Sequence, residues 1–474
     1  MKNMTLSNIA AACNGQLIAF EKNTNKEISG VVIDSRLVDD NFLFIATDGE
    51  RVDGHDFINS AFDKGASAVL CEKVPENPKG PYILVEDSLL ALRQLATWYR
   101  MQLDIKVVGI TGSVGKTSTK EFVSSVLSQK YKVLKTEGNF NNEIGLPLTV
   151  LRLRSEHEIA VLEMGINHFG EMHRLSEIAK PDIILITNIG DSHLEYLGSR
   201  EGVLKAKTEI FDFMKDDGKV ILNGNDDMLA TIKEVKGQKP IFFGIPDKSR
   251  SNGSKLDIFA ENIKPKGLLG STCLIKSKNQ ESLQIKANIP IPGKHMIDNA
   301  LAAASTGLAL GIPSQMISRG IEGVQPLDGR NNIIHHDKYT IIDDCYNANP
   351  SSMKAALDLL DTADTRKVAI LGDMGELGDN QVSLHKEIGK YYNTKNIDIL
   401  VSIGPLSKNI YDKALTKQTP SPLDSTNKLY YYENKEDFIQ AFPSILAEGD
   451  TVLIKASNYM GFEKIVNKLI NISR

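Results

Sequence analysis

A glycine-containing loop that joins an apolar run to a helical pattern is the strongest chemical signal in the chain. The segment TGSVGKTS, residues 111–118, follows the run KVVGI. Backbone N–H groups of such a loop and the positive end of the following helix can hold a phosphate. A glycine-rich turn before an ordinary helix is the structural alternative, but the strand, loop and helix stand in the order that a phosphate loop requires. The residues expected to hold nucleotide phosphates are Gly112, Ser113, Val114, Gly115, Lys116, Thr117 and Ser118.

The loop departs from the strict P-loop spacing, because Ile110 stands where that pattern has its first glycine. We expect Lys116 to reach the terminal phosphate and Thr117 to bind Mg²⁺. A GTPase-type switch is the alternative from a different class, since ILITNIGD places Asn188 where such a protein reads the base. Ile189 stands where switches of that type usually carry lysine, which disfavours the alternative.

Two further polar side chains follow apolar runs. Glu163 ends the run IAVLEM, and His193 comes shortly after DIILIT. We expect these runs to be neighbouring parallel strands, with both side chains on the rim that carries the phosphate loop. A carboxylate there suits Mg²⁺. An imidazole suggests a second metal position, although a purely structural role for His193 is equally consistent with the sequence.

The elements that must position these residues predict an α/β protein of three domains. At 474 residues the chain is long enough for about three. Short strand-like runs and the helical segment 88–102 predict a small α/β domain over residues 1–104. Strands alternating with helices predict a doubly wound parallel sheet over residues 105–325, with a β-rich excursion at 256–291. A second series of strands and helices predicts a Rossmann-like domain over residues 326–474.

Composition narrows the class of protein. A net charge of −5 disfavours a protein that coats nucleic acid. The four cysteines are dispersed, so neither a zinc ribbon nor a disulfide framework is expected, and a reducing cytoplasm fits best. The most apolar stretch, residues 300–312, is too short to span a bilayer and predicts a buried helix.

Taken together, these pieces resemble the Mur ligase family. The phosphate loop matches the loop of that family, which accounts for Ile110. Eight further segments follow in the family's order along nearly the whole chain: DSR (34–36), DGHDF (53–57), TEGNFNNEIGLPLTVL (136–151), EMGINHFGEM (163–172), TNIGDSHLEYLGS (187–199), DNALAA (298–303), DDCYNANPSSMKAAL (343–357) and LGDMGELG (371–378). The last two favour the branch that adds a dipeptide. Another ligase of the family, or a folylpolyglutamate-type enzyme, is the alternative.

The resemblance implies an ATP-dependent ligase of peptidoglycan precursor synthesis. The carboxylate of a UDP-N-acetylmuramoyl-tripeptide would attack the γ-phosphate of ATP and form an acyl phosphate. The amine of D-alanyl-D-alanine would then displace phosphate and give the pentapeptide and ADP. The resemblance also implies one Mg²⁺ held by Thr117 and Glu163, and a second held by His193 and a carbamylated Lys207. Composition alone favours an exposed helical lysine at position 207. The enzyme is expected to be monomeric.

The remaining site residues also come from the resemblance. Asn299 would contact adenine, with Arg330 and Asp344 on the phosphate and ribose side. The N-terminal domain would bind the uridine diphosphate end through Ser35, Arg36, Thr47, Asp53 and His55. The C-terminal domain would bind the dipeptide through Tyr346, Asn347 and Asn349.

The loop that carries these dipeptide residues precedes a predicted helix. Asn349 and Pro350 have the pattern of an N-cap and a first helical residue. The chain has Asn458 where the family often has arginine, and Met296 at a position that is often polar. The sequence leaves open how the dipeptide is anchored and whether the third residue of the tripeptide is lysine or diaminopimelate.

Overall fold

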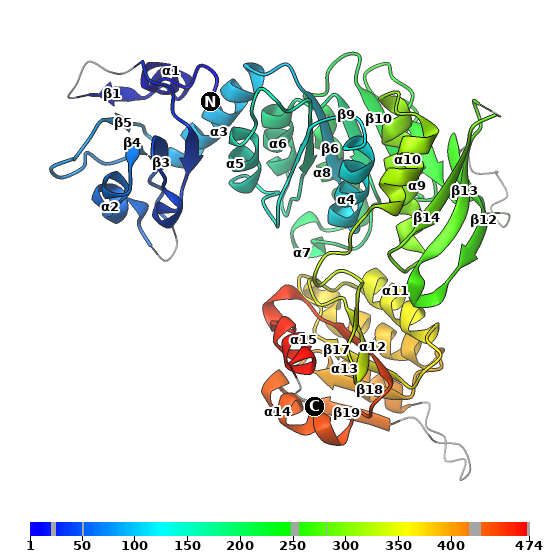
Figure 1. Cartoon of the computed structure of the whole chain (residues 1–474). Coiled ribbons are helices and arrows are strands. Elements are labelled where there is room, and N and C mark those ends of the chain that lie inside the picture. The colour runs from blue at the N-terminus through cyan, green and yellow to red at the C-terminus, as the bar shows by residue number, and fades with distance from the viewer. Residues whose placement is uncertain (20–24, 50–51, 248–255, 281, 417–427, 472–474) are drawn as a thin grey trace, which may run out of the picture.

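Three β-sheets organise the protein, as the computed structural model in Figure 1 shows. The structure describes residues 1–19, 25–49, 52–247, 256–280, 282–416 and 428–471. The sheets follow one another along the chain, so the mixed α/β architecture predicted from the sequence is confirmed. The domain boundaries at residues 104 and 325 stay predictions. In the described residues, no helix is both long enough and apolar enough to cross a membrane.

The first sheet has the strand order β1-β5-β4-β3-β2, and only β1 runs antiparallel to its neighbour. Its strands are β1 (Gln16–Ile18), β2 (Gly30–Val32), β3 (Phe42–Ile45), β4 (Ala66–Cys71) and β5 (Tyr82–Leu84). The helices of this region are α1 (Leu6–Ala12), η1 (Ser35–Leu37), η2 (Gly54–Phe57), α2 (Ile58–Asp63) and α3 (Ser88–Met101).

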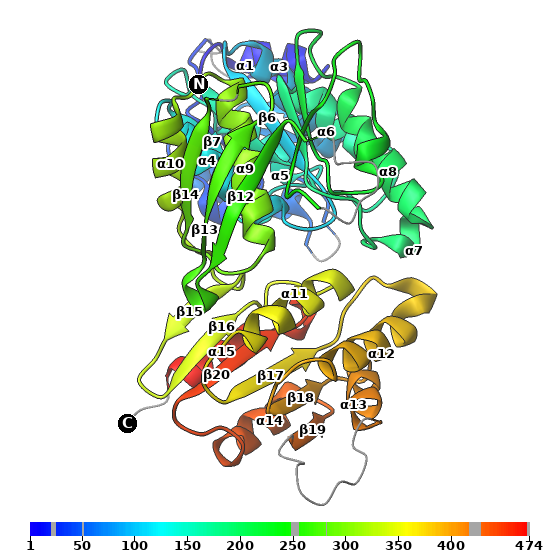
Figure 2. The same ribbon diagram turned by 90° about the vertical axis from the view of Figure 1, so that its right-hand side faces the viewer.

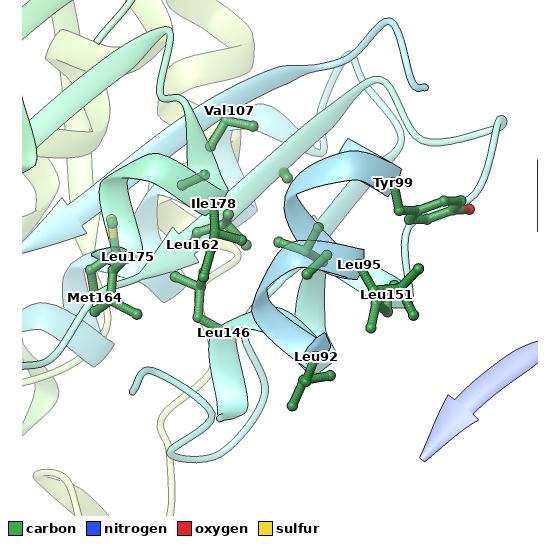
Figure 3. Close-up of a cluster of buried hydrophobic side chains, with 14 of the residues drawn as sticks. Leu92, Leu95, Tyr99, Val107, Leu146, Leu151, Leu162, Met164, Leu175 and Ile178 are labelled. Carbon is green, nitrogen blue, oxygen red and sulfur yellow. The ribbon is translucent and has the colours of Figure 1, made fainter. Parts of the chain in front are cut away.

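Helix α3 ties the first sheet to the central one. It begins at the N-cap Asp87, whose side chain accepts a hydrogen bond from the amide of Leu90. Its buried face packs on α5 (Gly145–Leu151) and α6 (Glu171–Ala179) in one continuous apolar cluster, part of which Figure 3 shows. The hydroxyl of buried Tyr99 donates to the carbonyl of Leu153 at 2.7 Å. Burial of this apolar face therefore stabilises the packing of α3 against the central sheet region.

The central sheet has nine strands in the order β14-β13-β12-β11-β10-β9-β6-β8-β7. Strands β6 to β12 are parallel to their neighbours, and β12, β13 and β14 pair antiparallel. The strands are β6 (Lys106–Thr111), β7 (Val133–Lys135), β8 (Ile159–Glu163), β9 (Ile183–Ile186), β10 (Lys219–Asn223), β11 (Ile241–Gly244), β12 (Ile258–Pro265), β13 (Ser271–Ser277) and β14 (Gln284–Ile289).

Two apolar layers cover this sheet, one on each face. Helices α4 (Lys116–Leu127), α9 (His295–Ala309) and α10 (Ser314–Glu322) share one cluster with one set of alternating strand residues. Helices α5, α6 and α8 (Arg200–Thr208) share the other cluster with the intervening set. Strands buried on both faces explain the continuous apolar runs of the sequence. The buried helix expected at residues 300–312 is confirmed over residues 300–309, which belong to α9.

One expectation about this sheet was wrong. The strands before Glu163 and His193, β8 and β9, are not neighbours, because β6 lies between them and pairs with both. The β-strand order of a doubly wound sheet is not the order of the sequence, and the chain crosses over β6 to build it. Both residues still follow the carboxyl ends of their strands, one on each side of the phosphate loop.

The third sheet has the order β15-β16-β20-β17-β18-β19, parallel except for β15. Its strands are β15 (Asn332–His335), β16 (Tyr339–Asp343), β17 (Lys367–Gly372), β18 (Ile399–Ile403), β19 (Lys428–Tyr432) and β20 (Asp450–Lys455). The helices around it are α11 (Pro350–Asp361), α12 (Gln381–Tyr392), α13 (Lys408–Leu415), α14 (Lys435–Ala441) and α15 (Glu463–Ile470).

Helix α11 faces the central sheet across the junction that Figure 2 displays. It begins as predicted. Asn349 is its N-cap, Pro350 its first residue, and Asn349 and Ser352 form a capping box. The residues expected on its core side, Met353, Ala356, Leu357 and Leu360, are buried.

Candidate active site

The phosphate loop is shaped by two glycines with positive φ. Gly115 has φ 82° and is the N-cap of α4, and Gly112 has φ 148°. A Cβ atom on Gly112 would lie 1.9 Å from Oγ1 of Thr187, so the loop can pass this point only as glycine. The loop therefore opens α4 with backbone amides available at its N-terminus, as an anion site requires.

Asn188 braces the loop from the end of β9. Its Oδ1 accepts a hydrogen bond from the amide of Val114 at 3.0 Å, and its Nδ2 donates to the carbonyl of Val114 at 2.9 Å. The amide of Ser113 donates to the backbone carbonyl of Asn188 at 3.0 Å. Both ends of the side-chain amide are thus engaged by the loop. A base-reading role for Asn188, which the GTPase-type alternative needs, has no support in this geometry.

Lys116 folds back over the loop. Its half-buried ammonium donates to the carbonyl of Gly112 at 2.9 Å. Burial lowers the pKa of Lys116, and the negative charge of Glu163 acts in the opposite direction. This internal contact holds the cation beside the glycines of the loop.

Glu163 is the centre of the buried polar network. The hydroxyl of Thr117 donates to its Oε1 at 3.1 Å, and Nδ2 of Asn141 donates to the same atom at 2.8 Å. The other oxygen, Oε2, is buried and has no hydrogen-bond partner among the described residues. The ammonium of Lys120 lies 3.9 Å from it. A buried carboxylate oxygen without a donor is a ready position for a cation, because such a group is costly to leave unpaired.

Lys120 and Asn141 belong to this network, and sequence reasoning missed both. Lys120 is 2% exposed and donates to the carbonyl of Thr136 at 2.7 Å. Lys120 lies one helical turn after Lys116, on the same face of α4. This spacing was the feature of the sequence that could have identified it. Asn141 lies in the segment 136–151 that was noted only as a block.

Lys207 is buried, so the alternative of an exposed helical lysine is excluded. Its side chain is 1% exposed on the inner face of α8, next to Val203 and Ala206. No hydrogen bond or ion pair reaches its amine from the residues that the structure describes. Burial, together with the nearby positive charge of Lys116, lowers the pKa of Lys207 well below its ordinary value. Burial therefore favours the neutral, nucleophilic form of the amine.

A cleft of about 790 Å³ runs between the central and third sheets. It is lined by most of the residues predicted to bind nucleotide, metal and dipeptide, namely Ser113, Val114, Gly115, Lys116, Thr117, Ser118, Glu163, His193, Asn299, Arg330, Asp344, Tyr346, Asn347 and Asn349. Gly112 and Lys207 are not among the lining residues. Segments more than two hundred positions apart in sequence are thus brought to one cavity.

The wall from the third sheet combines a buried ion pair with an aromatic contact. Oδ2 of Asp344 lies 2.6 Å from Nζ of Lys455, and the Asn331 amide donates to Oδ1. The guanidinium carbon of Arg330 lies 3.9 Å from the ring centre of Tyr346. Lys455, which is 2% exposed, was not singled out from the sequence. Its position at the end of an otherwise apolar strand run was the feature of the sequence that could have identified it.

Asn299 and Asn349 are already engaged by the protein. Asn299 accepts from the Thr119 hydroxyl at 2.9 Å, and its Nδ2 contacts Sδ of Met296 at 3.3 Å. The side chain of Asn349 caps α11. Both side chains line the cleft, but a ligand would meet Asn349 as part of a fixed helix terminus rather than as a free amide.

The residues predicted to hold the uridine diphosphate end form a separate group in the first sheet region. Ser35 and Arg36 begin η1 after β2, and Thr47, Asp53 and His55 follow β3. The guanidinium of Arg36, with its side chain 84% exposed, pairs with Asp34. None of the five lines the cleft.

His55 is held in a single tautomer. Its Nε2 accepts from the amide of Glu72 at 3.0 Å, so Nδ1 carries the proton, 2.6 Å from Oδ1 of Asp53. A hydrogen bond from Lys73 is the main cause that lowers the pKa of Asp53. Asp53 and His55 therefore form an ordered polar pair, with the ammonium of Lys73 bound to Asp53.

Among the described residues, no three or more His, Cys, Asp and Glu side chains gather in a metal-binding cluster. Cys13, Cys71, Cys273 and Cys345 are all free and buried.

Comparisons with known proteins agree with this geometry. Residues 27–100 match the Mur ligase family catalytic domain, residues 110–307 the Mur ligase middle domain, and residues 329–458 the Mur ligase glutamate ligase domain. The chain belongs to the Mur ligase family, as the sequence resemblance predicted.

Several relatives match this chain over nearly its whole length. The UDP-N-acetylmuramoyl-tripeptide–D-alanyl-D-alanine ligase of Bacillus subtilis is 39% identical over 99% of both chains. A crystal structure of MurF from Acinetobacter baumannii is 31% identical, covers 99% of both chains and has a TM-score of 0.86. MurF from Thermotoga maritima in complex with ADP is 29% identical, covers 93% of this chain and 96% of its own, and has a TM-score of 0.77.

Proposed function

We propose that this protein is an ATP-dependent ligase that joins D-alanyl-D-alanine to UDP-N-acetylmuramoyl-tripeptide in peptidoglycan precursor synthesis. The observation that carries the proposal is the single cleft in which the phosphate loop, Glu163 and the polar wall of the third sheet meet. The relatives that bear this activity as their name match the chain over nearly its whole length.

ATP would lie with its phosphates on the loop. The amides at the start of α4 and the ammonium of Lys116 would stabilise the charge that builds up on the transferring phosphoryl group. The adenosine end would face Asn299, Arg330 and Asp344, which line the same cleft. Attack by the tripeptide carboxylate on the γ-phosphorus releases ADP and leaves an acyl phosphate, whose carbonyl carbon the dipeptide amine then attacks as phosphate departs.

The residues beside the loop fit Mg²⁺. Thr117 offers a hydroxyl and Glu163 a buried carboxylate oxygen without a donor, which are the hard oxygen ligands that this ion takes. Bound there, Mg²⁺ would neutralise charge between the β- and γ-phosphates.

Lys207 fits the carbamate that the family resemblance implies. Addition of CO₂ forms a bond between the amine nitrogen and the carbon of CO₂ and releases one proton. It requires the neutral amine, which burial beside Lys116 favours. The product would be an anion attracted to the Lys116 cation, and together with His193 it would offer ligands for a second Mg²⁺.

The other substrates are assigned to the flanking regions. Ser35, Arg36, Thr47, Asp53 and His55 would hold the uridine diphosphate, and Tyr346, Asn347 and Asn349 would border the dipeptide. At the position where the family often has arginine, Asn458 begins η8 (Asn458–Met460), and the ammonium of Lys435 donates to the carbonyl of Met460 at 2.7 Å. A cation therefore stands against the same loop. The monomeric state and the cytoplasmic location stay predictions, the latter supported by the four free cysteines.

ADP release measured with each substrate omitted in turn tests the proposal. We expect release to require both the tripeptide substrate and D-alanyl-D-alanine, and mass spectrometry to detect the pentapeptide. Lys116→Ala should reduce kcat/KM by about 10²–10³-fold or more with an unchanged melting temperature. The exposed Lys390→Ala is the matched control. Equal ADP release without either substrate, and no joined product, would overturn the assignment.

A further inference from the structure

The loop after β17 contacts the central sheet region through the carboxylate of Glu376, which the mechanism above does not use. We propose that Glu376 is a positioning residue which orients the His193 imidazole across the cleft, so that the second metal position is completed only when the third sheet region lies against the central one. The role of this metal position rests on the proposed function. The contact between Glu376 and His193 is a feature of the structure and does not depend on that function.

The two side chains meet at a partly buried point. Oε2 of Glu376 lies 2.9 Å from Nδ1 of His193. The His193 side chain is 19% exposed and that of Glu376 54%. Nδ1 is buried and lacks a well-directed hydrogen bond among the described residues. Contacts of this kind are often loose before substrates bind and tighten in the working complex.

Both residues hold an unusual backbone conformation. His193 has φ 55° and Glu376 has φ 60°, in the left-handed region that non-glycine residues seldom adopt. Such a conformation is energetically unfavourable and persists only where the surroundings of the residue impose it. Two strained residues that face each other across a domain junction indicate a contact that the fold maintains at a cost.

The surroundings of each partner impose these conformations. The amide of Gly375, next to Glu376, donates to Oγ of Ser457 at 2.8 Å, and the amide of Met374 donates to Nε2 of His385 at 2.9 Å. His193 is the N-cap of α7 (Leu194–Leu197), and α7 contacts η6 (Gly378–Asn380). Figure 1 shows α7 reaching down toward the third sheet region. The loop is therefore anchored on its own sheet and presents the carboxylate outward.

The consequence for the imidazole is chemical. A carboxylate at Nδ1 favours the tautomer with the proton on Nδ1 and leaves the Nε2 lone pair free to bind a metal. Such carboxylate–histidine pairs commonly fix the ring and raise its basicity. Glu376 and Lys116 also attract each other electrostatically, so the negative charge of Glu376 acts on the side of the cleft that carries the phosphate loop.

The Glu376–His193 pair joins two different sheet regions. Glu376 follows β17 of the third sheet, whereas His193 follows β9 of the central sheet. Separation of the two regions would remove the carboxylate and free the ring to rotate. Assembly of the metal position and apposition of the two regions are thereby coupled.

The test compares Glu376→Gln with Asp379→Asn, an exposed carboxylate in the same loop. Mn²⁺ serves as the probe ion. Electron paramagnetic resonance counts the Mn²⁺ ions bound in the presence of ADP and phosphate, and steady-state kinetics separates kcat from KM. We expect Glu376→Gln to weaken the second Mn²⁺ by about 10–100-fold and to lower kcat by a similar factor, with little change in the KM for ATP. Asp379→Asn should match the wild type.

Two further measurements separate positioning from a merely structural contact. Glu376→Gln combined with His193→Ala should bind Mn²⁺ no more weakly than His193→Ala alone, because the first residue acts through the second. Nitrogen-15 spectra of the labelled histidines should show the His193 tautomer become mixed in Glu376→Gln.

Additive losses, or wild-type binding of the second Mn²⁺ and unchanged kcat in Glu376→Gln, would overturn the inference. If the wild-type enzyme shows no ligase turnover, the proposed function fails, while the tautomer measurement still decides whether Glu376 orients the ring.

Discussion

Gly112 and Thr187 lie so close that the structure leaves no room for a side chain between them. A Cβ on Gly112 would stand 1.9 Å from the Thr187 hydroxyl oxygen, which itself donates to the carbonyl of Val114 at 2.6 Å. Thr187, which follows β9, thus determines the course of the phosphate loop in two ways. Its hydroxyl bonds to the loop, and its side chain occupies the space that a side chain at Gly112 would need.

Gly112→Ala should therefore damage nucleotide binding more than its backbone strain alone predicts. We expect ADP affinity, measured by titration calorimetry, to fall at least about tenfold and the melting temperature to drop. Gly237→Ala is the matched control, since Gly237 also has positive φ but has open space where a Cβ would stand. Its substitution isolates the cost of the φ angle, about 1–3 kcal/mol. Equal behaviour of the two variants would contradict the steric argument.

Asn188→Ala should weaken every nucleotide alike. The substitution removes both side-chain hydrogen bonds to Val114, each with a net value of about 0.5–1.5 kcal/mol, so we expect affinity to fall roughly tenfold. The ratio of ATP to GTP affinity should not change, because the amide supports the loop and reads no base. Competition binding with both nucleotides measures this ratio, and the exposed Asn467→Ala serves as control. A loss confined to one nucleotide would revive the switch alternative.

Arg36→Ala should separate substrate binding from stability. The exposed ion pair with Asp34 is expected to add little to the stability of the fold, so the melting temperature should stay constant. If Arg36 binds the diphosphate, the KM for the UDP substrate should rise about tenfold or more, because hydrogen bonds to charged groups are worth about 1.5–3 kcal/mol. The KM values for ATP and D-alanyl-D-alanine should stay unchanged. Arg319→Ala, an exposed arginine on α10, is the control, and an unchanged KM in Arg36→Ala would remove Arg36 from the site.

Asp298 should make stability depend on pH near neutrality. Burial raises the pKa of this cleft-lining carboxyl to about 7, and its Oδ1 has no hydrogen-bond partner in the described residues. The unfolded pKa is about 3.9, so the folded state binds the extra proton between these values. Stability from the protonated form is present at low pH and is lost as pH rises toward 7.

Asp298→Asn should consequently gain stability over the wild type as pH increases. We expect the difference in melting temperature to be larger at pH 8 than at pH 5, by roughly 2–4 °C for each kcal/mol. Scanning fluorimetry across this range measures the difference, and the exposed Asp364→Asn provides the baseline. Parallel curves for Asp298→Asn and the wild type would show that the carboxyl titrates normally.

The parts of the site that are local in sequence could be predicted. The phosphate loop and the cap of α11 are each set by a few consecutive residues, and the structure places them as expected. Glu163 and His193 were expected at one rim because parallel strands end on the same edge. The strand order was missed, since the position of β6 between β8 and β9 depends on crossovers that no short segment encodes.

The supporting residues could not be predicted because their roles arise from distant contacts. Lys120 and Lys455 look like ordinary lysines in sequence, yet each is 2% exposed and pairs with or lies beside a carboxylate from another segment. The burial of Lys207 depends on how α8 packs, and the contact of Glu376 depends on how two sheet regions meet. Tertiary packing, rather than composition, decides such cases.

The cleft belongs to two separate bodies of the fold, with the phosphate loop on one wall and Arg330, Asp344 and Tyr346 on the other. Neither wall is a complete pocket in isolation. A small molecule lodged at the seam could act as a wedge, propping the halves apart without resembling any substrate. Inhibitor searches against this protein can therefore look for compounds that contact both walls of the cleft at once.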